Sequence, residues 1–253
     1  MLLFARLNRA AAMLLVLAFL GACAGANSRD LSPDGINDPY ENQNRKVHAF
    51  NRGLDRAIVR PAAIGYSTVL PDEIEDSIGN FASNLGQPSV MVNSLLQGNF
   101  RGAGQSALRF TVNSTLGLLG FFDVATEFKM ADHDTDFGET LFVWGAEEGV
   151  YLELPVLGPS TARNATGIIV DLFTNPLSYV WDSPEKYYGT GASVASGLST
   201  RGQFTDTIDS ILYESADSYA QARLIYLQNR RFSVGDSEAE SEIDPFELNT
   251  EGF

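Results

Sequence analysis

The 253-residue chain has one cysteine, two histidines and little positive charge. The lone Cys23 cannot form an internal disulfide. Its 17 Lys and Arg residues stand against 32 Asp and Glu residues, which gives a formal net charge of −15. Such a chain repels nucleic acid and anionic lipid headgroups. The composition therefore excludes nucleic acid as a partner, and any membrane contact has to come from apolar burial.

Catalytic motifs are also missing. No Gly-x-Ser-x-Gly nucleophile elbow is present, and the nearest approach, Gly191 to Ala195, is interpreted as part of a Gly/Ser-rich linker. The acidic loop Asp132 to Asp136 differs from a calcium-binding EF-hand loop, because Phe137 stands where glycine is required and Val143 replaces the closing glutamate. The sequence thus predicts no catalytic residue, no cofactor and no metal site, and the protein is not expected to be an enzyme.

Long apolar runs are absent after Cys23. Before it, Arg6 and Arg9 precede an apolar run from Ala10 to Leu20 that is too short to span a bilayer. The stretch Leu20-Gly21-Ala22-Cys23 resembles a bacterial lipoprotein signal, in which the peptidase cuts before the cysteine and acyl chains are attached to it. A signal peptide that ends near an unmodified cysteine is the alternative. Ala24, rather than an aspartate, favours the outer membrane.

The chain divides into four segments. Residues 1–22 are predicted to be the signal peptide, and residues 23–37 the lipidated cysteine with a flexible tether. Residues 38–232 form one domain, which is long enough to bury a core. Residues 233–253 carry seven acidic side chains without a lysine or arginine, which is typical of a disordered acidic tail.

Helical patterns dominate the domain. Pro71 precedes a predicted helix whose apolar stripe is Ile74, Ile78, Phe81 and Leu85. Pro88 is predicted to begin another helix, apolar around most of its circumference and therefore either buried or in contact with lipid. Further helices are expected over Arg101 to Leu116, from Thr166 to Asn175, over Arg201 to Tyr213 and over Ala216 to Arg231, with an interruption at Arg60-Pro61.

The middle of the domain has a different pattern. Thr140 to Gly145 and Val150 to Pro155 are rich in strand-forming residues, which predicts a hairpin or a pair of extended loops. The apolar run Leu116 to Phe122 is compatible with burial or with a membrane surface. The sequence therefore predicts a mainly α fold with either a short β-hairpin or a pair of extended loops.

Many short motifs follow one another in a fixed order from Asp38 to Arg231. Together they resemble the MlaA (VacJ) family of outer-membrane lipoproteins. They include Asp38-Pro39-Tyr40-Glu41, Asn44-Arg45, Phe50-Asn51, Leu54-Asp55, Arg60-Pro61, Asn84-Leu85, Val92-Asn93-Ser94-Leu95-Leu96-Gln97-Gly98, Asn113-Ser114-Thr115-Leu116-Gly117, Asp136-Phe137-Gly138-Glu139-Thr140-Leu141, Leu154-Pro155, and Asp217, Tyr219, Arg223 and Tyr226 in the closing helix.

The resemblance implies a single helical, donut-like ring in the inner leaflet of the outer membrane, on its periplasmic side, with a central amphipathic channel. Misplaced phospholipid from the outer leaflet would enter this channel and pass to a periplasmic carrier like MlaC, and a trimeric porin is a further possible partner. The alternative is a structural or adaptor lipoprotein of a porin complex that moves no lipid. A phospholipase is a weaker alternative, because no nucleophile and base are evident.

The resemblance also points to candidate residues for the channel. Asn51 and its neighbours match a family segment near the channel that keeps it closed, and the stretch from Phe142 to Pro155 matches a loop beside the pore. From the residues alone, the asparagines are equally explained as helix caps or cross-helix hydrogen-bond partners. The candidate channel or gate residues are Asn44, Phe50, Asn51, Asn93, Asn113 and Gly117, and the candidate pore-side residues are Phe142, Trp144, Tyr151, Leu154 and Pro155.

Overall fold

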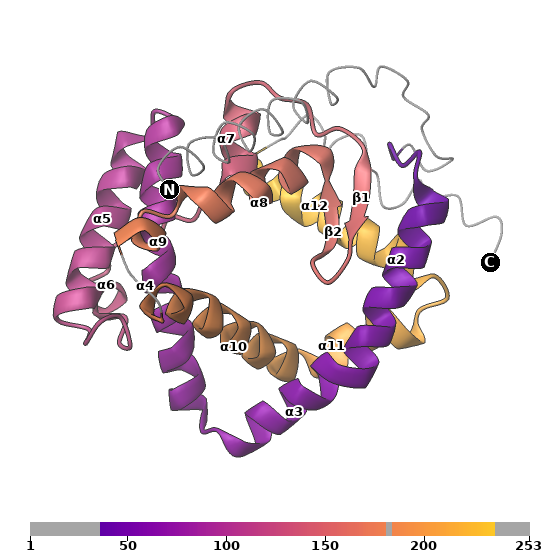
Figure 1. Ribbon diagram of the computed structural model, residues 1–253, viewed down its shortest axis with the longest axis horizontal. Helices are drawn as coiled ribbons and strands as arrows, with labels where there is room; N and C mark the ends of the chain where they lie inside the picture. Colours follow the sequence, from indigo (N-terminus) through magenta and orange to yellow (C-terminus); the bar gives the residue numbers. More distant parts are fainter. Residues whose placement is uncertain (1–35, 181–183, 236–253) are drawn as a thin grey trace, which may run out of the picture.

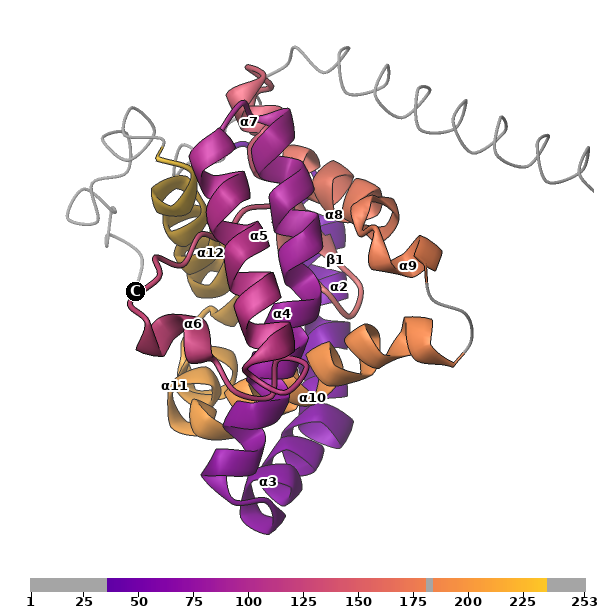
Figure 2. The same cartoon turned by 90° about the vertical axis from the view of Figure 1, so that its left-hand side faces the viewer.

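A computed structural model describes residues 36–180 and 184–235 of the chain (Figures 1 and 2). The described residues are mainly α-helical and include one two-stranded antiparallel sheet, as the sequence predicted. In chain order the elements are α2 (Glu41–Leu54), the π-helical turn η1 (Asp55–Val59), α3 (Arg60–Val69), α4 (Asp72–Leu96), α5 (Phe100–Thr115), α6 (Val124–Glu127), α7 (Phe137–Val143), β1 (Tyr151–Leu154), β2 (Gly158–Thr161), α8 (Ala162–Thr174), α9 (Leu177–Val180), the 3₁₀ turn η2 (Glu185–Tyr187), α10 (Tyr188–Gln203), α11 (Thr205–Asp209), the π-helical turn η3 (Ser210–Glu214) and α12 (Ser218–Val234).

The elements are arranged as a ring, which confirms the predicted architecture (Figure 1). α2, η1 and α3 form one arm, and α10 packs against both α3 and α4. α4 in turn contacts α7 and α8, α8 contacts the two strands, and β1 packs against α2 to close the circuit. α5 lies along α4 on the outside of the ring (Figure 2). The hairpin turn between β1 and β2 points toward the middle of the ring (Figure 1).

Two prolines that were expected to divide helices do not do so. α4 begins at Asp72 as predicted but continues to Leu96, with Pro88 buried inside it. A proline disturbs the hydrogen bonds of the preceding turn. Here the Asn175 side chain donates a hydrogen bond to the carbonyl oxygen of Leu85 (3.1 Å), which supplies a donor to that turn. Pro61 stands in the first turn of α3, where a proline is tolerated, and α3 follows η1 directly.

One of the two predicted strands is correct, because Val150 to Pro155 contains β1. β1 pairs with β2 from Tyr151 opposite Thr161 to Leu154 opposite Gly158. The first predicted strand, Thr140 to Gly145, instead falls in and just after α7. The Asp136 side chain caps this helix by accepting a hydrogen bond from the Glu139 amide (2.8 Å). A side-chain cap therefore outweighs the strand preference of the β-branched and aromatic residues that follow.

The predicted linker at Gly191 to Ala195 is part of α10. Close helix packing depends on a small residue further along α10, at Gly202. A Cβ atom on Gly202 would lie only 2.3 Å from the Ser67 Oγ of α3, so α10 could not approach α3 as closely with a larger residue there. The predicted helix from Arg201 to Tyr213 is divided among α10, α11 and η3, and the last helix, α12, ends at Gly235 with φ +72°.

The domain extends slightly beyond its expected ends. Ile36 is buried against Tyr151, Tyr219 and Leu227, and the Tyr151 amide donates a hydrogen bond to Asn37 O (2.8 Å). Both residues had been assigned to the tether. At the other end α12 continues to Val234, within the expected tail. The predicted signal peptide, Cys23 and the remainder of the tail, residues 236–253, lie outside the described residues.

An ion-pair network joins the two π-helical turns. Arg201 donates to Asp55 Oδ1 (2.9 Å) and to Asp209 Oδ1 (2.6 Å). Arg60 pairs with Asp209 (2.7 Å), and the Tyr213 hydroxyl donates to Asp55 Oδ2 (2.6 Å). Hydrogen bonds from Arg60 lower the pKa of Asp209. Burial by itself would raise the pKa of Asp55, but the bonds from Arg201 and Tyr213 lower it.

This network predicts a loss of stability in acid. A carboxylate whose pKa is lower in the folded state stabilises the fold above its unfolded pKa of about 3.9, and this contribution disappears as the pH falls through the folded pKa. The Asp209→Asn variant lacks the Asp209 contribution at every pH. The difference in urea midpoint between the unsubstituted protein and Asp209→Asn is therefore expected to be largest at pH 6 and to shrink toward pH 2. A difference that stays constant over this range would contradict the prediction.

Candidate functional site

Among the described residues, most side chains buried in the protein interior are polar, and many large apolar side chains are exposed on its surface. Among residues 36–180 and 184–235, 21 buried side chains are polar or charged and only 11 are apolar, whereas 31 large apolar side chains are exposed. A water-soluble domain has the opposite distribution in its core, and extensive exposed apolar surface marks contact with another apolar phase. No helix in the described part of the chain is both long and apolar enough to cross a bilayer.

Two candidate residues of α2 hold the β-hairpin. Asn44 Oδ1 accepts from the Glu153 amide (3.0 Å), and its Nδ2 donates to Tyr151 O (3.2 Å). Asn51 Nδ2 donates to Leu154 O (2.9 Å), and its Oδ1 accepts from the Val156 amide (2.8 Å). Residues seven apart lie on one face of a helix. The two asparagines therefore bind successive backbone groups along β1 and into the turn.

Asn51 contacts the most strained point of the hairpin. Val156 has φ +70°, a left-handed conformation that is unfavourable for a β-branched residue and costs on the order of 1–3 kcal/mol. The Val156 and Leu157 side chains are exposed at the turn. The hydrogen bond from the Val156 amide to Asn51 therefore fixes a conformation that the turn sequence alone would not favour.

A buried polar network lies behind β1. Arg223 Nη1 of α12 pairs with Asp38 Oδ2 (2.6 Å), and the Tyr219 hydroxyl donates to the same carboxylate. The Tyr151 hydroxyl donates to Glu153 Oε2 (2.5 Å). Burial and the nearby carboxylates raise the pKa of both Tyr151 and Tyr219. The Tyr151 ring also packs edge-on against the Tyr219 ring, with centroids 5.9 Å apart, and the Tyr151 amide binds Asn37 O, so the base of the hairpin is joined to α12 and to the segment that precedes α2.

His48 continues this network. Its Nδ1 lies 3.2 Å from Glu153 Oε1, and its Nε2 lies 3.1 Å from Ser218 Oγ. The imidazole is buried between α2, β1 and the start of α12, so it cannot contact a substrate in this conformation. The second histidine, His133, lies in the loop before α7 beside Asn99 (3.3 Å).

Asn93 lies elsewhere in the ring. It is fully buried, donates to Asp171 Oδ1 (2.9 Å) and accepts from Thr140 Oγ1 (3.2 Å). Asp171 also accepts from the Phe137 amide (2.9 Å). Asn93 therefore joins α4 to α7 and α8.

Asn113 and Gly117 shape the loop after α5. Asn113 donates to Asp123 Oδ1 (2.9 Å) and accepts from the Ala125 amide (2.8 Å). A Cβ atom on Gly117 would lie 2.1 Å from Phe122 O, so only glycine fits there. The loop presents exposed Leu116, Leu118, Leu119 and Phe122, which identifies this apolar run as surface and not as core.

The candidate pore-side residues belong to two different elements. Phe142 is in α7 under the Arg163 guanidinium, 5.0 Å from the ring centroid, and the exposed Trp144 donates from Nε1 to Leu96 O (3.0 Å). Tyr151 and Leu154 are in β1, and the exposed Pro155 begins the hairpin turn. Of the sequence candidates, the structure brings Asn44, Asn51, Tyr151, Leu154 and Pro155 together. Phe50 is on the same helix and exposed.

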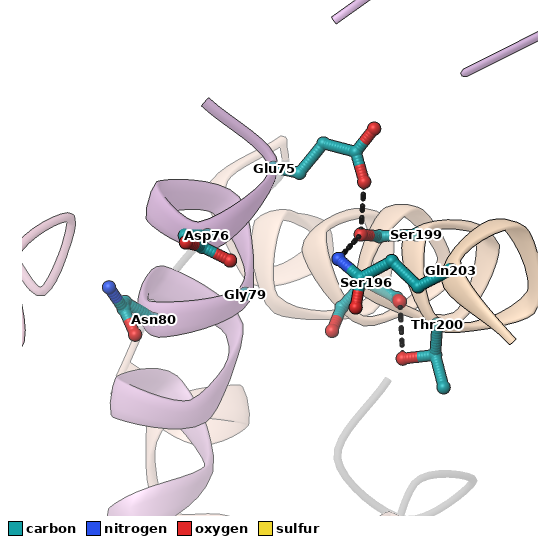
Figure 3. A pocket seen from close by; sticks show the side chains of 8 residues that line it. All are labelled: Glu75, Asp76, Gly79, Asn80, Ser196, Ser199, Thr200 and Gln203. Atoms are coloured by element: carbon teal, nitrogen blue, oxygen red, sulfur yellow. Dashed lines mark hydrogen bonds between the residues drawn. The ribbon is translucent and has the colours of Figure 1, made fainter. Parts of the chain in front are cut away.

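A polar pocket that the sequence analysis missed lies between α4 and α10 (Figure 3). Its volume is about 290 Å³, and all of its lining residues are polar or glycine. Glu75 reaches from α4 to Ser199 of α10, whose hydroxyl donates to Glu75 Oε2. On α10 the lining residues Ser196, Ser199, Thr200 and Gln203 stand at the spacing of one helix face. That polar stripe was the available signal, but it was divided, because the residues around Gly191 to Ala195 were interpreted as a linker and the next helix was predicted to begin at Arg201.

In the described part of the chain, no group of three or more His, Cys, Asp or Glu side chains is placed to hold a metal ion. The charged clusters are instead ion pairs between arginines and carboxylates, such as Arg109 with Asp123 (2.9 Å) and Arg230 with Asp136 (2.6 Å). These pairs fix loops against helices.

Comparison with known proteins gives a consistent result. The profile of the family described as "MlaA lipoprotein" matches residues 36–233. The protein of Escherichia coli (strain K12) named "Intermembrane phospholipid transport system lipoprotein MlaA" is 33% identical over 242 residues, which cover 94% of this chain and 93% of that protein. An uncharacterized protein of Rickettsia typhi (strain ATCC VR-144 / Wilmington) is 36% identical over 200 residues, or 79% of this chain and 78% of that protein.

The fold comparison agrees. A solved structure from work on the "Structural basis for maintenance of bacterial outer membrane lipid asymmetry" matches with a TM-score of 0.67 and 35% identity, covering 78% of this chain and 98% of that chain. The family profile covers residues 36–233, relatives are more than 30% identical over most of their length, and a solved structure shares the fold. The chain therefore belongs to the MlaA lipoprotein family.

Proposed function

We propose that this protein removes phospholipid from the outer leaflet of the outer membrane and hands it to a soluble lipid carrier in the periplasm. Its relatives in Escherichia coli and Haemophilus influenzae are named as lipoproteins of an intermembrane phospholipid transport system. The matching structure comes from work on outer-membrane lipid asymmetry. Moving a lipid without changing it requires no nucleophile and no general base, and the sequence offers neither.

The observation that carries the proposal is the inverted polarity of the ring. Exposed apolar side chains such as Phe100, Leu108 and Leu119 suit contact with acyl chains, while buried polar side chains line the helix contacts. A lipid headgroup that leaves water for hydrocarbon loses hydrogen bonds worth several kcal/mol. In this proposal the headgroup follows a polar path through the ring and avoids this loss, while exposed apolar side chains of the protein contact the acyl chains.

In this proposal the hairpin is the gate. Its turn points toward the middle of the ring, and Asn51 holds it there through two hydrogen bonds. Asn44 fixes the base of the same strand. The other candidates have an indirect, structural role in this proposal. Each of them makes a local contact within a helix or loop that stabilises the ring: Asn93, Asn113 and Gly117.

Attachment to the membrane would combine two contributions. Acyl chains on Cys23 anchor the amino terminus, and the exposed apolar ring adds its own burial in the inner leaflet. A trimeric porin and an MlaC-like carrier are the partners that the family resemblance suggests. They would contact the ring from the membrane and from the periplasm respectively.

The test is the amount of phospholipid in the outer leaflet of cells that lack this protein. An outer-membrane phospholipase added as a reporter releases products only from lipid on the outer face. We expect its products to rise several-fold in the deletion strain and to return to normal when the intact gene is restored. Unchanged outer-leaflet lipid together with loss of a porin complex would instead support an adaptor.

A further inference from the structure

The tip of the β-hairpin, residues 155–157, is entirely apolar. It is formed by Pro155, Val156 and Leu157, between the paired strand residues Leu154 and Gly158. Hairpin turns more often contain Asn, Asp, Ser or Gly, which suit the dihedral angles of a turn. The Val156 and Leu157 side chains are 70% and 64% exposed. Packing within the fold therefore does not explain an apolar tip.

The backbone of the hairpin also favours another residue at the tip. Two residues in and just after the turn are left-handed, Val156 with φ +70° and Gly158 with φ +80°. Glycine adopts this conformation without strain, whereas a β-branched residue does not. The sequence thus has glycine at one left-handed position and keeps valine at the other. Backbone strain of this kind is concentrated at functional sites, which indicates that the valine side chain itself is needed.

The place of the tip in the ring supplies a reason. The hairpin turn points toward the middle of the ring (Figure 1). Its backbone is held on both sides by Asn51, which accepts a hydrogen bond from the Val156 amide (2.8 Å) and donates one to Leu154 O (2.9 Å). The Val156 and Leu157 side chains stand on this fixed backbone and remain exposed. The protein therefore presents two aliphatic side chains from a turn that is held toward the middle of the ring.

Aliphatic side chains affect the two parts of a phospholipid differently. Valine and leucine side chains have no hydrogen-bond donor or acceptor, so contact with them deprives a headgroup of the hydrogen bonds that it makes in water. Acyl chains lose no hydrogen bond on the same contact, and the contact removes apolar surface of both partners from water. An apolar tip in the path of a lipid is therefore a barrier to the headgroup and a favourable contact for the acyl chains.

We propose that the Val156 and Leu157 side chains close the ring, as an apolar barrier that the phospholipid headgroup has to pass and that the acyl chains contact. The inference rests on the proposed lipid transport and names the side chains that limit its rate. Asn51 positions the turn, and the strain at Val156 results from an apolar side chain at a position that suits glycine. Removal of this side chain stabilises the protein and at the same time opens the ring.

The experiment compares thermal unfolding with lipid transfer for the full lipidated chain. Unfolding is followed in detergent. Transfer of a fluorescent phospholipid is measured from vesicles that contain the protein to the soluble periplasmic carrier, after subtraction of the rate for protein-free vesicles. Val156→Gly relieves the strain, so we expect its unfolding midpoint to rise by about 2–4 °C. Its transfer should nevertheless be several-fold faster, while the amide of residue 156 stays protected from hydrogen exchange.

Position 157 separates the barrier from the strain, because Leu157 has no positive φ. Leu157→Ser makes the tip polar and smaller, and should speed transfer several-fold. Leu157→Trp makes the apolar tip larger and should slow transfer. Since the side chain is exposed, neither variant should move the unfolding midpoint by more than about 2 °C.

Lys129→Gly is the matched control. Lys129 is exposed in the turn after α6 and has φ +54°, so glycine relieves the same kind of strain outside the hairpin. This variant should gain stability as Val156→Gly does and transfer lipid at the unsubstituted rate. Equal acceleration by both glycine variants would overturn the inference, because relief of strain would then set the rate.

The remaining outcomes separate this inference from the transport proposal. If the unsubstituted chain transfers lipid and neither Val156→Gly nor Leu157→Ser changes the rate, the tip is not the barrier, and lipid transport stands. If the unsubstituted chain gives no transfer above the protein-free rate, the transport proposal is contradicted, and this inference with it.

Discussion

Arg223→Met is expected to lower the free energy of unfolding by about 3–5 kcal/mol, because it removes one partner of a buried ion pair. The Arg223 and Asp38 side chains are 3% and 0% exposed, and their closest atoms lie 2.6 Å apart. Methionine retains most of the volume but leaves the Asp38 carboxylate buried without its cation. For a chain of this size the midpoint of thermal unfolding should fall by at least about 6 °C.

Arg45→Met is the matched control. Arg45 also pairs with two carboxylates, Glu41 and Asp217, but its side chain is 39% exposed. Exposed pairs contribute about 0–1 kcal/mol, so this variant should unfold close to the unsubstituted protein. The double variant Asp38→Asn with Arg223→Met removes both charges and should be more stable than Arg223→Met alone. Equal losses from Arg223→Met and Arg45→Met would show that burial of the pair does not determine its contribution.

The Asp38–Arg223 pair also bears on the proposed gate. Asn44 donates to Asp38 Oδ1 (2.8 Å) and at the same time binds the backbone of β1. Loss of the pair would therefore loosen the base of the hairpin as well as α12. If Arg223→Met both lowers stability and speeds lipid transfer, the faster transfer would be explained by the loosened base of the hairpin.

The sequence predicted the helical elements better than their orientation. Local signals placed the start of α4 at Pro71-Asp72, the end of α8 at Asn175-Pro176 and the last helix at about its observed position. The apolar stripe of α4 was found, yet Ile74 is 47% exposed whereas Glu75 and Asn84 are buried. Periodicity shows that a helix has two faces, but the burial of α4 does not follow them, since Leu85 of the apolar stripe is buried next to Asn84 while Ile74 at the start of the stripe is exposed.

The candidate site was predictable in part. The spacing of Asn44 and Asn51 places them on one helix face, but their partners are backbone groups about 105 residues away, and no local pattern identifies these. Asn93 and Asn113 share the residue type but lie in separate contacts of α4 and α5. A side chain that binds a backbone group does not require a particular residue type as its partner. The sequence therefore could not distinguish the asparagines that bind the hairpin from those that bind a neighbouring helix or loop.

Asn51→Ala is expected to release the hairpin turn. The variant removes the hydrogen bonds to Leu154 O and from the Val156 amide, each of which contributes about 1 kcal/mol. The unfavourable φ of Val156 would then relax. Hydrogen exchange protection of the Val156 amide should fall at least about tenfold, and lipid transfer from donor vesicles to the carrier should become several-fold faster.

Asn42→Ala is the matched control, because Asn42 is an exposed asparagine of the same helix. It should change neither the protection of Val156 nor the transfer rate. Asn51→Asp keeps the acceptor for the Val156 amide but loses the donor to Leu154 O. In this variant the hydrogen exchange protection of the Val156 amide should lie between that in the unsubstituted protein and that in Asn51→Ala.

The two readouts together test whether the hairpin controls transport. If Asn51 only stabilises the fold, Asn51→Ala will lose protection throughout α2 and β1, and transfer will slow as folded protein is lost. If the hairpin is the gate, the loss will be confined to the turn around Val156, and transfer will speed up while the unfolding midpoint changes little. A turn that opens without any change in transfer would exclude the hairpin from the lipid path and move the gate to another element of the ring.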